Sequence, residues 1–450
     1  MQSDKKSGFT IVMFLLFIAT QLFSQNPIIR DQFSADPSAR VFGAKVYVYP
    51  SHDILAKEGQ GRPGWFCMAD YHVFSSSNLE NWTDHGVIVS QDKVDWVDPT
   101  GYSMWAPDCI ERDGKYYFYF PTRPQKANGP MAMMVGVAVA DQPYGPFVPQ
   151  PEPIANVLGI DPNVFIDSDG QAYLYWSGRG GFFVSKLKDN MLELDSEPQV
   201  IDNLPAKGLK EGAWVFERNG TYYLTFPHVE NGTERLEYAM GESPTGPFTM
   251  TGVIMDESPT GCWTNHHSII EFNDQWYLFY HHNDLSPYFD KNRSVRIDSL
   301  FFNGDGTIRK VVPTLRGVGI TDASKQIQID RYSQKSPQGV SVAFLDTSNT
   351  FGGWKAILDG EKSWIQYNSV DFGNGEFKSV NLKALSGSGG NLEIRVDNPD
   401  GPVIAHAEIP QGAGWKTVNA PLLEAASGVR NLVVVLQDKG NAEVDWLMFE

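Results

Sequence analysis

The amino-acid sequence predicts an all-β protein in two parts, a five-bladed β-propeller followed by a β-sandwich of jelly-roll type. Three observations support this fold class. A short aromatic motif recurs five times over residues 26–320, and short alternating strands separated by Gly, Asn, Asp and Ser fill residues 329–450. Apolar residues with helical spacing are hard to find in either part. Aromatic residues make up 13% of the 450-residue chain, which argues against disorder and against a coiled coil.

Each copy of the recurring motif is a turn residue followed by a strand with a tyrosine at its centre. The central tyrosines are Tyr47, Tyr117, Tyr173, Tyr223 and Tyr277. A strand that follows a Gly or Asp turn is half of a β-hairpin. Further strands fit between the copies at 86–89, 135–139 and 236–239. Five antiparallel units of about fifty residues are typical of a propeller, whose blades are four-stranded sheets around a channel.

One position upstream of the central tyrosines holds a polar or aromatic side chain in every copy. Eleven or twelve residues before the tyrosines stand Asp36, Trp105, Asp161, Glu211 and His266. The first strand of a propeller blade lines the channel, so equivalent positions at its start converge on the axis. The shared phase therefore predicts one polar pocket at one mouth of the channel. Taken singly, each acid could be a solvated turn residue, and the Asp-Pro pairs at 36–37 and 161–162 could be plain turns.

The residues around these positions resemble the blade motifs of glycoside hydrolase family 43. The motifs are Ala35-Asp36-Pro37, Trp105-Ala106-Pro107-Asp108, Ile160-Asp161-Pro162-Asn163, Lys210-Glu211-Gly212 and His266-His267-Ser268. The resemblance implies a five-bladed propeller that hydrolyses glycosides with inversion. It also implies that Asp36 is the general base, Glu211 the general acid, and Asp161 the residue that orients Glu211 and raises its pKa. Ala213 and Asn265 depart from the family's pattern without removing a catalytic group.

These roles agree with the chemistry of inversion. An inverting enzyme uses one protonated and one ionised carboxyl, with room between them for a water molecule. A negative charge beside Glu211 would keep it protonated. Three further side chains are expected to contact the sugar. Trp105 offers a flat apolar face, His266 shares the phase of the acids, and Arg296 is expected to return to the pocket in the closing blade.

The resemblance also implies the substrate class. Common substrates of the family are α-L-arabinofuranosides and β-D-xylosides, so we expect an exo-acting α-L-arabinofuranosidase or β-xylosidase. Its substrate would be a plant cell-wall polysaccharide or oligosaccharide of the arabinoxylan or arabinan type, and catalysis would need no cofactor. A catalytically silent sugar-binding propeller is the alternative of a different class. It would not need three phased carboxylates, and all three are present.

A linker is expected at 321–328 and a second domain at 329–450. The stretches 327–332, 364–367 and 444–447 resemble carbohydrate-binding module family 6. This resemblance implies a structural calcium ion near Asp330 and Asp445, and carboxylate oxygens suit calcium. Modules of this family often carry a second Trp just after the one that matches Trp415, and this chain has Val418 nearby. A sugar-binding sandwich and a vestigial, structural one therefore both stay open.

Residues 1–25 predict an export signal. Lys5 and Lys6 precede a mostly apolar run from 9 to 23, and Ser24-Gln25 offers a cleavage point. No cysteine follows the run closely, so we expect a secreted or periplasmic protein without a lipid anchor. An uncleaved anchor helix is the alternative, although the run is short for a membrane span.

Net charge and cysteine spacing exclude several other classes of protein. A formal net charge of −18 argues against a nucleic-acid or anionic-membrane partner, since both require a basic surface. Cys67, Cys109 and Cys262 have neither the spacing of a zinc site nor that of a disulfide framework, and they could form one bridge at most.

Overall fold

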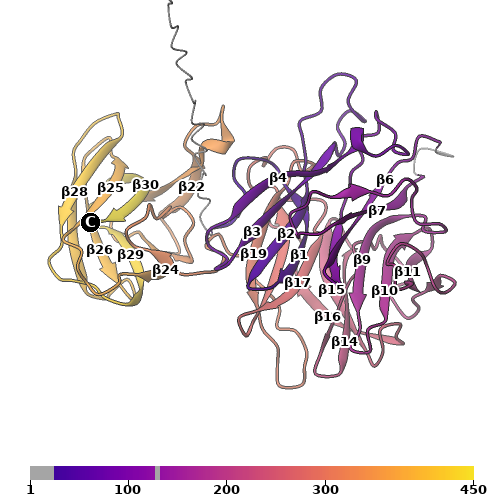
Figure 1. The fold of residues 1–450 in the computed structure, drawn as a ribbon. Helices are drawn as coiled ribbons and strands as arrows, with labels where there is room; N and C mark the ends of the chain where they lie inside the picture. Colours follow the sequence, from indigo (N-terminus) through magenta and orange to yellow (C-terminus); the bar gives the residue numbers. More distant parts are fainter. Residues whose placement is uncertain (1–24, 127–131) are drawn as a thin grey trace, which may run out of the picture.

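A computed structural model describes residues 25–126 and 132–450, and their regular structure is almost all strand (Figure 1). The helical elements of these residues are two short 3-10 turns, η1 (Gln91–Lys93) and η2 (Thr350–Gly352). Within the same ranges no helix combines the length and the apolar character that a bilayer crossing requires. The chain is therefore all-β, as predicted. The expected export signal lies outside the described residues, except for Gln25.

Residues 35–300 form five antiparallel sheets, each built from strands consecutive in the chain. The first sheet holds β1 (Ala35–Phe42), β2 (Lys45–Ser51), β3 (Asp70–Ser76) and β4 (Thr83–Ser90). The second holds β5 (Asp108–Arg112), β6 (Lys115–Thr122), β7 (Met134–Ala140) and β8 (Val148–Pro149). The third holds β9 (Ile160–Ile166), β10 (Ala172–Gly178), β11 (Gly181–Lys186) and β12 (Gln199–Val200). The fourth holds β13 (Trp214–Arg218), β14 (Thr221–Val229), β15 (Glu234–Gly241) and β16 (Phe248–Met255), and the fifth holds β17 (His267–Phe272), β18 (Gln275–His282) and β19 (Ser294–Leu300).

The sequence motif marks the same place in every sheet. Each central tyrosine lies in the second strand, in β2, β6, β10, β14 and β18 respectively. The strands expected at 86–89, 135–139 and 236–239 are β4, β7 and β15. Buried apolar clusters join the first sheet to the second, the second to the third, and the third to the fourth. A further cluster joins the fourth and fifth sheets to the first, so the packing closes into a ring.

The N-terminal segment 26–34 completes this closure by lying along the last strand of the fifth sheet. The backbone N–H of Ile28 donates to the carbonyl of Val295, and that of Ser34 donates to the carbonyl of Arg293. The Asn26 side chain bonds the carbonyl of Ile297 at 3.0 Å. Because β19 ends a three-stranded sheet, the segment covers backbone groups that would otherwise form an open edge.

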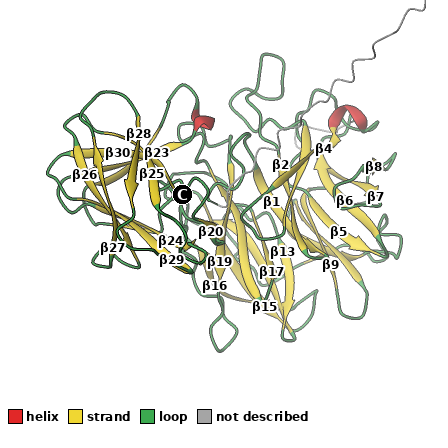
Figure 2. Cartoon of the chain, turned by 60° about the vertical axis from the view of Figure 1, so that its left-hand side comes forward, coloured by secondary structure: helices red, strands yellow, loops and turns green. Residues whose placement is uncertain are grey.

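Residues 321–449 form two further sheets that enclose one apolar core (Figure 2). One sheet holds β20 (Thr321–Asp322), β21 (Gln334–Lys335), β24 (Trp364–Asp371), β26 (Gly390–Val396), β27 (Val403–Ile409) and β29 (Val429–Leu436). The other holds β22 (Val340–Phe344), β23 (Trp354–Asp359), β25 (Ser379–Leu385), β28 (Lys416–Pro421) and β30 (Asn441–Phe449).

The linker expected at 321–328 is wrong, because this segment is part of the second domain. Thr321 and Asp322 pair in parallel with Val370 and Asp371 of β24. Ile327 is buried in the core and bridges to Leu447. This short pairing supplies hydrogen-bond partners for backbone N–H and C=O groups in a segment whose sequence has no strand pattern.

A buried arginine joins the two parts, which lie side by side (Figure 1). The guanidinium of Arg331 stacks on the Trp354 ring at 3.4 Å, donates to Asp330 at 2.8 Å and to the carbonyl of Asn26 at 3.2 Å. Next to it, Trp354 packs with Phe33 from the N-terminal segment. Gln25 is also buried, and its side chain donates to the Tyr367 hydroxyl of the second domain.

Candidate active site

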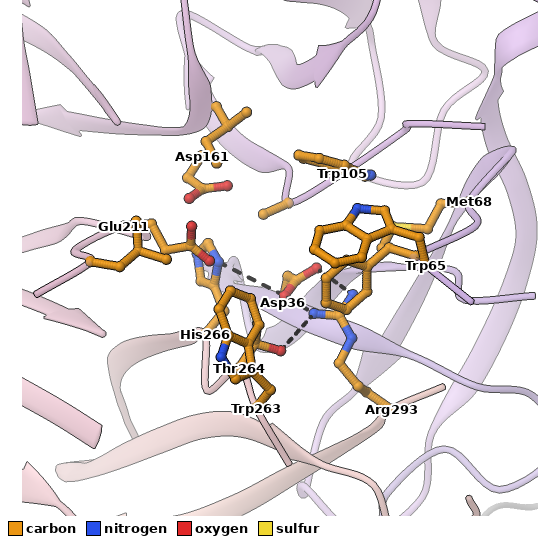
Figure 3. A pocket seen from close by; sticks show the side chains of 14 residues that line it. Asp36, Trp65, Met68, Trp105, Asp161, Glu211, Trp263, Thr264, His266 and Arg293 are labelled. Carbon is orange, nitrogen blue, oxygen red and sulfur yellow. Dashed lines mark hydrogen bonds and ion pairs between the residues drawn. The ribbon is translucent and has the colours of Figure 1, made fainter. Parts of the chain in front are cut away.

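All five phased side chains line one pocket, as the phase predicts (Figure 3). The pocket encloses about 260 Å³. Three carboxyl groups, those of Asp36, Asp161 and Glu211, reach it from the starts of β1 and β9 and from the loop before β13. Aromatic side chains form much of the remaining wall, namely Trp65, Phe66, Trp105 and Trp263. Such a mixture of carboxyls and flat apolar surfaces suits a ring-shaped ligand rich in hydroxyls.

Irregular backbone turns two of the acids into the pocket. Asp36 has a φ of 48° and Asp161 a φ of 56°, a left-handed conformation that few residue types other than glycine adopt. The pairing of β1 with β2 shifts its register between Ala35 and Ser38, and the pairing of β9 with β10 shifts opposite Asp161. These are bulges, which bend a strand and redirect a side chain. The two Asp-Pro pairs are therefore strained strand starts rather than plain turns.

Asp36 is held as a carboxylate by a buried arginine. Arg293 donates to both of its oxygens, at 2.7 and 3.1 Å, and Ser51 donates to Oδ2 at 2.7 Å. The same guanidinium donates to Asp53. Burial alone would raise the pKa of Asp36, but the charge of Arg293 and the two nearby histidines outweigh it and lower the pKa to about 2.

The other two acids hold their protons more tightly. Burial first, and then the charge of Asp36, raise the pKa of Glu211 to about 7. Burial and repulsion from Glu211 raise the pKa of Asp161 well above its usual range. The sequence predicts that Asp161 keeps Glu211 protonated. In the structure, burial is the largest cause of the raised pKa of Glu211, and the repulsion between the two acids raises mainly the pKa of Asp161. Oδ2 of Asp161 accepts the N–H of Gly212 at 2.9 Å, which fixes the backbone next to Glu211.

Of the three expected sugar contacts, two line the pocket and one does not. Trp105 and His266 are in its wall, and the His266 ring lies close enough to Gly212 that an added Cβ would approach it to 3.0 Å. Arg296, which is expected to return to the pocket, does not line it. Its guanidinium donates to His282 at 2.7 Å and to the carbonyl of Thr314 at 2.5 Å, on the side of the sheet that faces the second domain.

The arginine of the pocket is Arg293, one residue before β19 begins. Sequence reasoning missed it, and also Trp65 and Trp263, because none of them shares the phase of the central tyrosines. A fourth acid, Glu234 at the start of β15, was missed as well; it is fully buried and linked to Glu211 by a side-chain hydrogen bond. The only signal for Arg293 was its place beside the last predicted strand.

The candidate calcium ligands lie in the second domain. Oδ1 of Asp330 is buried and meets no donor in the described part of the chain, which leaves an oxygen for a cation. Oδ2 of Asp330 accepts from Arg331, and Oδ2 of Asp445 pairs with Lys383 at 2.8 Å. Burial raises the pKa of Asp445, and the charge of Asp330 adds to this shift. Their donor set fits calcium, and the assignment stays a prediction.

Residues 25–126 and 132–450 also contain one possible metal-binding group and all three cysteines. One group of three side chains there could hold a metal ion, His52, Asp70 and His72, outside the pocket; its histidines already bond Asp70 and Asp84. The three cysteines are free and buried, so no bridge forms among them.

Comparisons with known proteins cover both parts of the chain. The family described as Glycosyl hydrolases family 43 matches residues 24–308, and Carbohydrate binding module (family 6) matches residues 334–450. Xylosidase/arabinosidase 43A of Humicola insolens is 38% identical over 63% of this chain and 98% of its own length. The arabinoxylan arabinofuranohydrolase of Bacillus subtilis (strain 168) is 27% identical over 95% of this chain and 92% of its own length.

Two similar solved structures also differ in the share of this chain that they cover. CoXyl43, a β-xylosidase/α-arabinofuranosidase from a compost microbial metagenome in complex with xylotriose, aligns with a TM-score of 0.58 and 36% identity. It covers 65% of this chain and 98% of its own. A Bacillus subtilis arabinoxylan arabinofuranohydrolase in complex with cellotetraose has a TM-score of 0.54 and 25% identity, and covers 95% of this chain and 99% of its own.

The ion pairs of Arg293 predict a large loss of stability on their removal. In R293M, Asp36 and Asp53 keep their burial and lose their cation, which costs about 3–5 kcal/mol for a buried pair. R430M, which breaks a solvent-exposed pair with Asp397, should cost less than about 1 kcal/mol. Because the folded state lowers the pKa of Asp36 to about 2, its contribution is complete above roughly pH 4 and is lost as the pH falls towards 2. The midpoints of urea unfolding of wild type and R293M should therefore converge below pH 4, and equal midpoints at neutral pH would contradict the assignment.

Proposed function

The chain belongs to glycosyl hydrolase family 43 and is a glycoside hydrolase acting on O-glycosyl bonds, and we propose that it is an inverting, exo-acting α-L-arabinofuranosidase of arabinoxylan-type substrates. The observation that carries the proposal is that the pocket contains one carboxyl with a lowered pKa and one with a raised pKa. Asp36 is ionised, with a pKa of about 2, whereas Glu211 has a pKa of about 7. This is the state in which an inverting glycosidase begins its reaction.

The proposed reaction uses each acid once. Asp36 accepts a proton from a water molecule as the water attacks the anomeric carbon. Glu211 donates its proton to the oxygen of the leaving sugar, so the glycosidic bond breaks without releasing an alkoxide. The third carboxyl, Asp161, accepts the N–H of Gly212 and so holds the backbone next to Glu211. Trp105 and His266 would contact the bound sugar from the pocket wall.

Relatives that match both parts of the chain favour arabinofuranoside removal. The arabinoxylan arabinofuranohydrolase of Bacillus subtilis aligns over 95% of this chain, including the C-terminal module. The relatives named xylosidase/arabinosidase and β-xylosidase align over the pocket-bearing part only, at 38% and 35% identity. They favour a second candidate, a β-xylosidase, because their identity is higher where the sugar would bind. A silent sugar-binding protein is not favoured, since the three carboxyls share one pocket.

We further infer that the five sheets are the blades of a β-propeller and that the two C-terminal sheets are a β-sandwich. The closed ring of apolar clusters supports the first and the shared core supports the second. Sugar binding by the C-terminal module stays a prediction. So does secretion or location in the periplasm, because it depends on residues outside the described ranges.

A substrate screen tests the activity. Turnover should be highest on 4-nitrophenyl α-L-arabinofuranoside and on arabinose-decorated xylan, with free arabinose as the product detected by chromatography. Higher turnover on 4-nitrophenyl β-D-xyloside and xylo-oligosaccharides would select the β-xylosidase instead. Absence of turnover on all four by a folded protein would contradict both candidates.

Substitution of the two acids tests their roles. E211A should lose about 10²–10⁴-fold in kcat on arabinoxylan oligosaccharides and much less on the nitrophenyl glycoside, because nitrophenolate leaves without a proton. D36A should lose activity on both, because the water then lacks its base. Steady-state kinetics on the two substrate types measure the difference. If D36A kept aryl-glycoside turnover and E211A did not, the two roles would have to be exchanged.

Removal of calcium should affect the stability of the module and not the chemistry. If Asp330 and Asp445 bind calcium, a chelator should lower the unfolding temperature by a few degrees, roughly the shift that follows from the loss of a bound ligand. Nitrophenyl glycoside turnover at 25 °C should stay within about twofold, because the cleavage step uses carboxyls only. D445N should abolish the thermal shift. Loss of turnover with an unchanged circular dichroism spectrum would contradict a purely structural ion.

A further inference from the structure

Glu234 is a fully buried acid that the proposed reaction does not yet use. It begins β15, directly behind the pocket wall formed by Trp263 and Thr264. Its backbone N–H donates to the carbonyl of Trp263 at 3.0 Å. Its Oε2 accepts the N–H of Asn265 at 2.7 Å. The backbone of this wall therefore holds Glu234 at two points.

The second carboxyl oxygen of Glu234 has no backbone or hydroxyl donor among the described residues. This oxygen, Oε1, is buried. Its partner is the carboxyl of Glu211, to which Glu234 is joined by a side-chain hydrogen bond. Two carboxylates cannot bond each other in this way, so one of them carries the proton. The cation of the pocket, Arg293, is already bound to Asp36 and Asp53.

We infer that Glu234 is a positioning residue for the general acid: it stays neutral and donates a hydrogen bond from Oε1 to the carboxyl of Glu211. This bond holds the Glu211 side chain in the geometry for proton donation. It also stabilises the carboxylate that Glu211 becomes when its proton goes to the leaving oxygen. Glu234 keeps its own proton throughout, and solvent returns the proton to Glu211. The inference rests on the role proposed for Glu211.

The charges around the pair agree with this assignment. Glu234 faces Glu211, Asp161 and the buried thiol of Cys262, and no partner among these is cationic. Burial, and then the charge of Glu211, raise the pKa of Glu234 well above its usual range. Glu211 in addition faces Asp36 and Arg293. Glu211 is therefore the member of the pair that loses its proton first as the pH rises.

Two variants of Glu234 separate positioning from a merely structural role. E234M keeps the length of the side chain and removes the donor, so oligosaccharide kcat should fall about 10–100-fold while aryl-glycoside kcat falls less than about threefold. Without the donor, the Glu211 carboxylate is less stable, so the alkaline limb of kcat/KM should move to higher pH. E234Q restores an N–H donor and should return oligosaccharide kcat to within about fivefold of wild type, with the alkaline limb in its original place.

Two control variants make the outcomes distinguishable. Glu237 lies on the same strand, is buried, and pairs with His228 and Arg235 instead of the pocket acids, so E237Q should leave both the ratio of the two activities and the pH profile unchanged. Equal losses on both substrates in E234M and E234Q, with an unmoved alkaline limb, would overturn the inference. So would a move of that limb to lower pH. Should E234M not fold, E234A serves for the same ratio. If E211A itself showed no preference for the aryl substrate, the proposed role of Glu211 would fail first.

Discussion

The buried guanidinium of Arg293 is the interaction on which both the ring and the pocket depend. It precedes β19 in the last sheet, whereas Asp36 lies in β1 of the first sheet and Asp53 lies just after β2 of that sheet. A charge this deeply buried is tolerated only when its N–H groups are bonded and its charge is balanced. Here the guanidinium donates to both carboxylates and to Thr264. The same bonds therefore connect the ends of the ring and keep Asp36 ionised.

Carboxyl groups with lowered and raised pKa values share one small cavity because their surroundings differ in positive charge. On one side, Asp36 receives an arginine, a serine hydroxyl and the potential of two histidines. On the other, Asp161 and Glu234 each accept a backbone N–H, Glu211 bonds Glu234, and none of the three forms an ion pair within the described residues. Burial favours the neutral form of a carboxyl wherever no positive charge compensates. The location of a single arginine thus decides which carboxyl has a lowered pKa and which have raised ones.

The sequence predicts the shared pocket well because a ring of repeated units converts spacing along the chain into position in space. Asp36, Trp105, Asp161, Glu211 and His266 were found in this way. The method fails for residues between the repeats. Arg293 and Arg296 are three residues apart, so they point to opposite faces of an extended chain, and the sequence does not reveal which face meets the channel. Glu234 starts a third strand, where no phase is available, and β20 is too short to have a pattern.

The backbone pairing of residues 26–34 with β19 has a consequence for the order in which the protein folds during synthesis. Synthesis begins at the N-terminus, yet Asn26 bonds the carbonyl of Leu315, and Asp36 bonds an arginine 257 positions later. The early sheets can form as they leave the ribosome, because their strands are neighbours in the chain. The first segment, however, must wait without its partner strand until about 270 more residues have been added. The ring therefore closes last, and a ribosome-bound chain that stops before Arg293 has its first four sheets but lacks the guanidinium that pairs with Asp36.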